Sequence, residues 1–105
     1  MDRYSITQNH LRDLKIGYEL AKSSKNDFLN KYVINQLNDV KSNYIYSFLT
    51  DFDLVFSYAL DLVLFIKTSR IINNVSSSNY FMSRLRETVE LYPELESKVE
   101  IREVL

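Results

Sequence analysis

The sequence predicts an all-α fold, a four- to five-helix bundle around a nearly all-round apolar helix at about residues 50–72. Only one glycine and one proline occur among the 105 residues. Because tight turns use both residue types, their scarcity predicts few connections between long helices. The apolar content of 46% is ordinary for a folded domain, and the length predicts a single domain over residues 1–105.

The first helix is predicted to start after Ser5 or Thr7, because Ser5 and Gln8 have the spacing of a capping box. Apolar residues then recur at three- and four-residue steps as far as Ala21, which is typical of one helix face. The polar residues 22–26 predict the first break. Asn26 or the residue after it, Asp27, can cap the next helix.

The second helix is predicted to end before a new one that starts at Thr50. Apolar residues from Leu29 to Phe48 recur at helical spacing. Thr50 can then cap a helix whose first turn carries Asp51 and Asp53, where the helix dipole favours negative charge. The alternative is one continuous helix over residues 27–70, about 66 Å long.

The most apolar run, residues 54–66, predicts a buried helix rather than a membrane span. A span needs about 20 apolar residues, and this run is shorter and contains Asp61. Its polar positions Asp53, Ser57 and Asp61 lie four apart and predict one narrow polar seam. We expect this seam to be the solvated stripe of the helix, with docking of a partner's Lys or Arg as the alternative.

The polar residues 73–79 predict the main loop, with Ser78 or Asn79 as the N-cap of a fourth helix. That helix is predicted to end before Pro93, since a residue that precedes proline avoids the α region. The tail over residues 95–105 has both helical and strand-like character. A short helix is favoured, because a lone strand would lack a partner.

No internal repeat is predicted from the sequence. Tyr4, Tyr18, Tyr32 and Tyr46 are evenly spaced, but the interval crosses two predicted breaks. Coincidence therefore explains the spacing better than repetition does.

No residue pattern indicates catalysis, and we expect no enzymatic activity, metal or cofactor. The chain has no cysteine, and His10, its only histidine, is predicted to be a packing residue. Arg3 with His10 resembles the loosest Arg–His motif of HEPN ribonucleases, but the match covers only these two residues. The Asp51-x-Asp53 pattern of some glycosyltransferases belongs to a larger α/β fold, so helix capping explains it better here.

The charges do not favour nucleic acid as a partner. The net charge is −1, and the residues that could form a small basic patch are few. They are Lys67, Arg70, Arg84 and Arg86. The N-terminal residues lack an apolar stretch, so no signal peptide and a cytoplasmic location are expected.

The excess of apolar surface on the helix at 50–72 predicts a partner, most simply a second copy in a two-fold homodimer. We therefore expect a non-enzymatic protein–protein interaction module: a small inhibitor, immunity or accessory protein of a phage, plasmid, virus or AT-rich bacterium. Bacteriocin immunity proteins are helical bundles of similar size, an analogy of architecture alone. Alternatives are a small nucleic-acid-binding protein and a membrane-surface protein. The candidate partner-binding residues are Tyr46, Tyr80, Asp53, Ser57, Asp61, Arg84 and Arg86.

Overall fold

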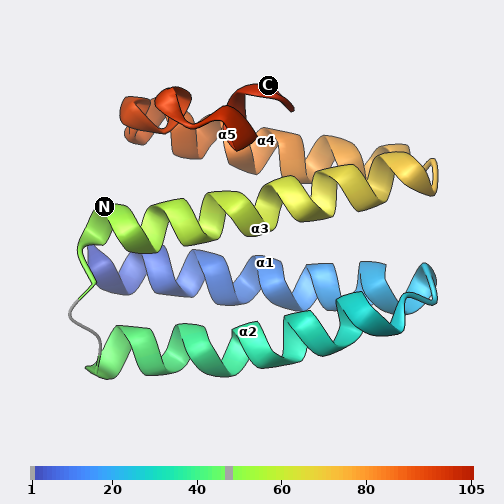
Figure 1. The fold of residues 1–105 in the computed structure, drawn as a ribbon, viewed down its shortest axis with the longest axis horizontal. Coiled ribbons are helices and arrows are strands. Elements are labelled where there is room, and N and C mark those ends of the chain that lie inside the picture. Colours follow the sequence, from blue (N-terminus) through green and yellow to red (C-terminus); the bar gives the residue numbers. More distant parts are fainter. Residues whose placement is uncertain (1, 47–48) are drawn as a thin grey trace. The chain divides into compact units, whose positions relative to one another are not determined.

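The computed structural model describes residues 2–46 and 49–105, and Figure 1 shows their helices. In order these are α1 Arg3–Ser23, α2 Asp27–Tyr46, α3 Asp51–Ile71, α4 Val75–Leu91, the 3-10 helix η1 Pro93–Ser97 and α5 Val99–Arg102. No strand occurs among the described residues, so the predicted all-α fold is confirmed.

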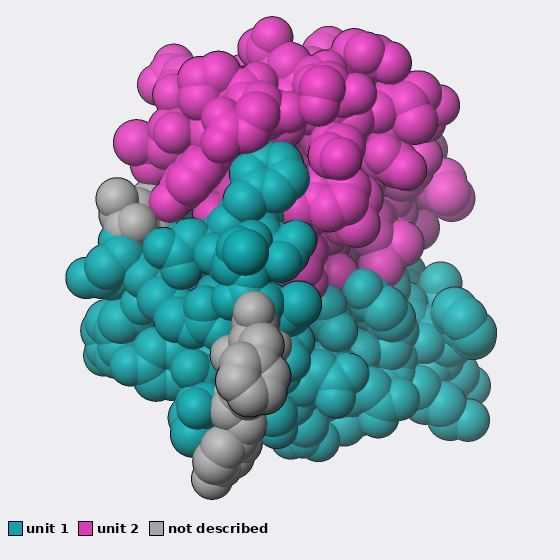
Figure 2. All heavy atoms as spheres, turned by 60° about the vertical axis from the view of Figure 1, so that its left-hand side comes forward, with its two compact units in different colours: residues 1–54 teal, residues 55–105 magenta. Residues whose placement is uncertain are grey.

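The chain divides into two compact units, Met1–Leu54 and Val55–Leu105, coloured separately in Figure 2. Each unit is described by itself below. The single domain expected over residues 1–105 stays a prediction.

Helix α1 begins earlier than the sequence predicted. Its N-cap is Asp2, whose carboxylate accepts a hydrogen bond of 2.8 Å from the backbone N–H of Ser5. Aspartate caps helices as well as serine does, and it reaches the amide three residues on. The expected start after Ser5 or Thr7 is therefore wrong, and Ser5 lies within the first turn.

The turn between α1 and α2 is built from one left-handed residue and one asparagine. Lys25 has φ 55°, and its amide donates to the carbonyl of Lys22. The next amide, that of Asn26, donates to the carbonyl of Ala21, which completes a Schellman motif. The Asn26 side chain then accepts from the N–H of Leu29 and caps α2, as predicted.

The turn between α3 and α4 has the same construction. Asn73 has φ 57°, and its amide donates to the carbonyl of Arg70. The Asn74 amide donates to the carbonyl of Ser69, at 2.8 Å. The Asn74 side chain accepts from the N–H of Ser77, at 3.0 Å, and caps α4.

The loop expected at residues 73–79 is therefore wrong in extent. Asn74, rather than Ser78 or Asn79, is the N-cap, and the serines after Val75 form the first helical turn. Serine costs little there because first-turn amides have no partner within the helix. A polar run that suggests a loop can thus be the start of a helix.

The helical hairpin α1–α2 and the helical hairpin α3–α4 share one plan of helix starts and turn, while the expectation of no internal sequence repeat stays a prediction. Their first helices begin at Arg3 and Asp51, and their second helices at Asp27 and Val75; both pairs are 48 positions apart. We name these segments hairpin 1 (residues 3–46) and hairpin 2 (residues 51–91). Identical residues at this offset are Asp13 and Asp61, Leu14 and Leu62, Asn26 and Asn74, Tyr32 and Tyr80, Leu37 and Leu85, and Tyr44 and Tyr92.

In hairpin 1, α2 runs back along α1 (Figure 1). The rings of Tyr4 and Tyr44 meet edge to face at 6.0 Å near the open end. At the same end, the guanidinium of Arg3 donates to the carbonyls of Asn43 and Leu49, at 3.0 and 2.8 Å. These contacts hold the start of α1 to the end of α2.

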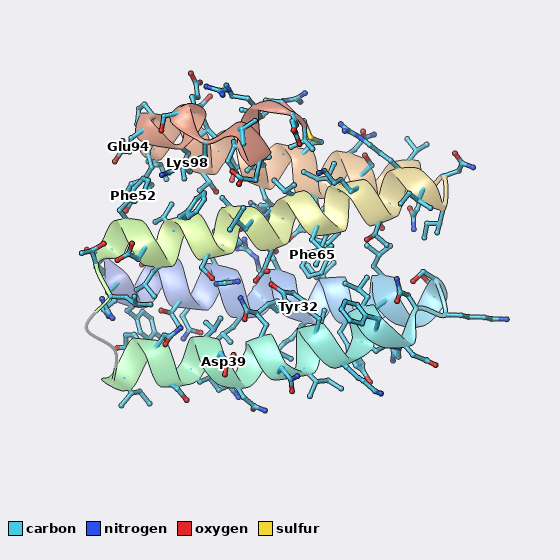
Figure 3. The ribbon with its side chains drawn as sticks, viewed as in Figure 1. Tyr32, Asp39, Phe52, Phe65, Glu94 and Lys98 are labelled. Carbon is cyan, nitrogen blue, oxygen red and sulfur yellow. The ribbon has the colours of Figure 1, made fainter. Side chains whose placement is uncertain are left out.

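In the second unit, the rings of Phe65 on α3 and Phe81 on α4 pack 5.1 Å apart (Phe65 is labelled in Figure 3). The C-terminal segment also contacts α3. The Nζ of Lys98, also labelled there, lies 5.2 Å from the ring centre of Phe56. The tail forms η1 and α5 with buried Leu95 and Ile101, so the favoured helical tail is confirmed.

The apolar helix predicted at about 50–72 is α3, and it is separate from α2. The alternative of one continuous helix over 27–70 is therefore wrong. Every apolar side chain from Leu54 to Ile66 is buried or half-buried. Phe48, expected on the apolar face of the second helix, lies outside the described residues.

The left-handed residues give a direct test of the two turns. Glycine adopts this conformation without the Cβ clash, so Lys25→Gly should raise the free energy of unfolding by about 1 kcal/mol. Asn73→Gly should raise it less, because asparagine tolerates the left-handed region better than lysine does. Urea unfolding followed by circular dichroism measures both.

Lys31→Gly is the matched control, because Lys31 is exposed within α2, after its first turn. Glycine there should lower the free energy of unfolding by about 1 kcal/mol. A loss of stability in Lys25→Gly as large as that in Lys31→Gly would contradict the turn geometry.

Candidate functional site

Asp53 belongs to a reciprocal cap at the start of α3. The backbone N–H and the hydroxyl of Thr50 donate to its carboxylate, at 3.0 and 2.9 Å. The Asp53 N–H donates in return to the Thr50 hydroxyl oxygen, at 3.1 Å. This is a capping box with aspartate at its third helical position, so the predicted cap at Thr50 is confirmed.

Two hydrogen bonds hold the pKa of Asp53 below its usual value. The bond from the Thr50 backbone N–H has the larger effect, and the bond from the Thr50 hydroxyl has the smaller one. Both bonds favour the charged carboxylate. The Asp53 side chain therefore stabilises the start of α3.

The predicted solvated seam is wrong at its far end. Asp53 is exposed and Ser57 half-buried, but Asp61 is buried, with 2% of its surface exposed. Four residues advance a helix by 400°, so each step along the seam rotates the side chain by about 40°. Asp61 therefore points about 80° away from Asp53, and the three side chains present no continuous docking surface.

Buried carboxylates occupy the same position in both hairpins. Asp13 on α1 is 1% exposed and corresponds to Asp61 on α3. The Arg12 guanidinium holds both oxygens of Asp13, with Nε and Nη2 each at 3.1 Å. Asp61 also has an interacting partner. A buried charge is tolerated only when it is paired, and the Arg12 guanidinium provides that pairing for Asp13.

Tyr80 and Arg84 contact each other along α4. The guanidinium carbon of Arg84 lies 5.1 Å from the ring centre of half-buried Tyr80. The Tyr80 ring also meets that of Phe81 edge to face, at 5.2 Å. This packing limits Tyr80 as a free anchor. The side chain of Tyr46, the other expected anchor, lies outside the described residues.

The expected basic patch is largely neutralised. Lys67 pairs with Glu103 at 3.6 Å, and Arg84 pairs with Glu87 at 3.2 Å. Arg86 is exposed but lies two residues from Arg84, about 200° around the helix. Arg84 and Arg86 therefore lie on different sides of α4.

Arg3 and His10, the two residues that resemble the Arg–His motif, both lie on α1. Arg3 is occupied by two backbone carbonyls and lies 3.6 Å from Asp51. His10 is buried, in agreement with a packing role. Among the described residues, no group of three potential metal ligands is found. No helix in the same part of the chain is long and apolar enough to cross a membrane.

The second hairpin ends in an exposed apolar surface that the sequence did not single out. Ile71 is 80% exposed, Val75 69% and Ile72 37%. They flank the turn of hairpin 2, and we call these three residues the hairpin 2 tip. Isolated exposed apolar residues are common, and here three of them flank one turn.

Hairpin 1 shows that the turn does not need these apolar residues. It has the same backbone hydrogen bonds and the same capping asparagine. At the positions that correspond to the hairpin 2 tip it carries Ser23, Ser24 and Asp27. The apolar character of the hairpin 2 tip is therefore independent of the local fold.

A pocket of about 200 Å³ lies beside the hairpin 2 tip. Val75 belongs to both the pocket and the tip. Arg70 is the cation among the lining residues, and its Nη2 lies 3.4 Å from the carbonyl oxygen of Val104 and 3.7 Å from the sulfur of Met82. The pocket is lined by Ser69, Arg70, Asn73, Asn74, Val75 and Ser78.

The sequence held one signal for this site that was misinterpreted. Ile71 and Ile72 were assigned to the buried apolar helix, although they stand directly before the Asn73–Asn74 turn. At a helix end, side chains are more exposed than in the middle, so two isoleucines there could have indicated a surface.

Comparison of this chain with protein-family models, with curated proteins and with solved structures found no match. The functional interpretation therefore depends on the structure of the chain itself.

The capping box predicts a contribution of Asp53 to acid sensitivity. The pKa of Asp53 in the folded chain lies below its ordinary value of 3.8. The stabilisation by its carboxylate is therefore present above pH 3.8. This stabilisation is lost as the pH falls through the lowered pKa of Asp53 in the folded chain. Asp53→Asn cannot titrate there, so from about pH 5 to about pH 2 the variant should lose less stability than the wild type.

Urea unfolding at a series of pH values measures this difference. Thr50→Ser keeps the hydroxyl donor and should retain the acid sensitivity of the wild type. Equal losses in Asp53→Asn and in the wild type would contradict the role given to this carboxylate.

Proposed function

We propose that this chain is a non-enzymatic protein–protein interaction module that binds through the hairpin 2 tip. The observation that carries the proposal is the difference between two otherwise equivalent turns. Hairpin 1 carries Ser23, Ser24 and Asp27 at these positions and exposes Phe28 beside them, whereas hairpin 2 exposes Ile71 and Val75. Folding alone does not account for that difference.

Burial of the hairpin 2 tip by a partner would provide a substantial driving force. Burying a large aliphatic side chain stabilises by about 1.5–3 kcal/mol. Ile71 and Val75 are the most exposed of the three and would be the main anchors. Such anchors dominate the energy of many interfaces, while the surrounding contacts exclude water.

We propose a different protein, rather than a second copy, as the partner, and the area of the hairpin 2 tip requires further contacts around it. A stable interface buries about 800 Å² on each side, more than three aliphatic side chains supply. The apolar residues of α3 from Leu54 to Ile66, on which a homodimer was expected, are buried or half-buried. The homodimer remains the simplest alternative.

As a cellular role, we propose a small inhibitor, immunity or accessory protein that acts in the cytoplasm by occupying a surface of its partner. This role requires binding without chemistry. It is supported by the occupation of Asp53, Arg84 and Asp61 in contacts within the chain.

Affinity capture from the native host, with identification by mass spectrometry, tests the proposal. The wild-type chain should retain specific proteins that the double variant Ile71→Ser/Val75→Ser loses. Phe28→Ser is the matched control, because Phe28 is an exposed apolar residue at the turn of hairpin 1. It should retain the same proteins as the wild type.

Retention of the same proteins by all three chains would contradict binding through the hairpin 2 tip. Light scattering at micromolar concentration decides between the two kinds of partner. A dimer that Ile71→Ser/Val75→Ser converts to monomer would replace the proposed partner by a second copy.

A further inference from the structure

We propose that the pocket beside the hairpin 2 tip binds a carboxylate side chain of the partner. The recognised segment is then an acidic residue flanked by apolar residues. This inference rests on the proposed function, because it places the same partner segment on the same turn.

The size of the pocket fits one side chain. Its volume of about 200 Å³ lies below the range of about 300–1,000 Å³ typical of small-molecule sites. Its lining is mainly apolar by area, and the Arg70 guanidinium, with the side chains of Asn73 and Ser78, supplies its polar groups. A carboxylate side chain could reach the Arg70 guanidinium while its aliphatic part covers apolar lining.

The charge around the pocket favours a carboxylate. No aspartate or glutamate occurs in residues 62–86, although Glu103 from the C-terminal segment lies 3.6 Å from Lys67. Arg70 places a guanidinium in the pocket lining. Arginine matches the two oxygens of a carboxylate with parallel N–H donors, which makes such hydrogen bonds strong and directional.

The position of Arg70 is constrained before any partner binds. Its Nη2 lies 3.4 Å from the carbonyl oxygen of Val104 and 3.7 Å from the sulfur of Met82. Holding a long side chain in place reduces the entropy that binding would otherwise cost. The contact also links the pocket to the C-terminal residues of the same unit.

Val75 and Ile71 indicate which residues should flank the acidic residue of the partner segment. Val75 lines the pocket and is 69% exposed, and Ile71 is 80% exposed on the other side of the turn. A partner segment that inserts a carboxylate would lay its neighbouring residues on these two side chains. Apolar neighbours would bury them.

Hairpin 1 lacks this combination. Lys22 corresponds to Arg70 but pairs with Glu19 at 3.2 Å. Asp27 stands at the position of Val75, and its negative charge would repel a carboxylate. The inference therefore applies to the turn of hairpin 2.

An anionic membrane surface is the competing partner, and the charges favour it less. Membrane attachment through charge draws on clusters of several cations. Of the cations near this turn, Lys67 is paired with Glu103, which leaves Arg70 as the cation that lines the pocket. One directed guanidinium suits one carboxylate better than a layer of headgroups.

Selection of a phage-displayed library of random dodecapeptides on the immobilised full chain tests the inference. Enriched peptides should share an Asp or Glu next to Leu, Ile, Val or Phe. Fluorescence anisotropy then compares one labelled enriched peptide with its Glu→Gln or Asp→Asn counterpart. Loss of the peptide's carboxylate should weaken binding to the wild-type chain about tenfold.

Variants of the chain assign that effect to Arg70. Arg70→Gln should weaken binding about tenfold, and removing the peptide carboxylate should then cost little more, because the two groups interact with each other. Arg70→Lys should weaken binding less. Arg86→Gln is the matched control, because Arg86 is exposed on α4 outside the pocket, and it should bind like the wild type.

The outcomes separate this inference from the proposed function. Peptides that need Ile71 and Val75 but have no acidic residue would overturn the carboxylate site and leave the proposed function intact. Failure to select any peptide that depends on Ile71 and Val75 would contradict both. Sedimentation with phosphatidylserine-containing vesicles that is lost in Arg70→Gln would overturn the inference in favour of lipid.

Discussion

The hydrogen bonds of a single asparagine in each turn are the interactions on which both hairpins depend. The backbone N–H of Asn26 or Asn74 closes the preceding helix, and the side chain caps the following one. The residue before it must enter the left-handed region, where Lys25 and Asn73 are found. One short segment thus satisfies polar groups of two helix ends and fixes where the second helix starts.

Because one asparagine supplies these hydrogen bonds, the other positions of the turn are free to vary. In hairpin 1 they carry serine and aspartate, and in hairpin 2 they carry the apolar hairpin 2 tip beside the pocket with Arg70. Surface chemistry is thereby separated from the backbone geometry that supports it. The buried pairs in each hairpin, such as Phe65 with Phe81, contribute stability without limiting what the turn presents to a partner.

Features with a local cause could be predicted from the sequence, and features that depend on context could not. The caps at Asn26 and Thr50 follow from side chains that reach nearby amides. The start of α1 was missed because Asp2 competes with Ser5 for the same role. The common plan of the hairpins was missed because it lies in helix ends and hydrogen bonds, which different residues can supply. The hairpin 2 tip was missed because exposure depends on where a helix ends.

The most direct test replaces the hairpin 2 tip by the residues of hairpin 1, in the triple variant Ile71→Ser/Ile72→Ser/Val75→Asp. The free energy of unfolding in urea should stay within about 0.5 kcal/mol of the wild type, as for exposed positions without a structural role. A loss of about 2 kcal/mol or more would show that these side chains stabilise the fold, and it would contradict their assignment to a partner.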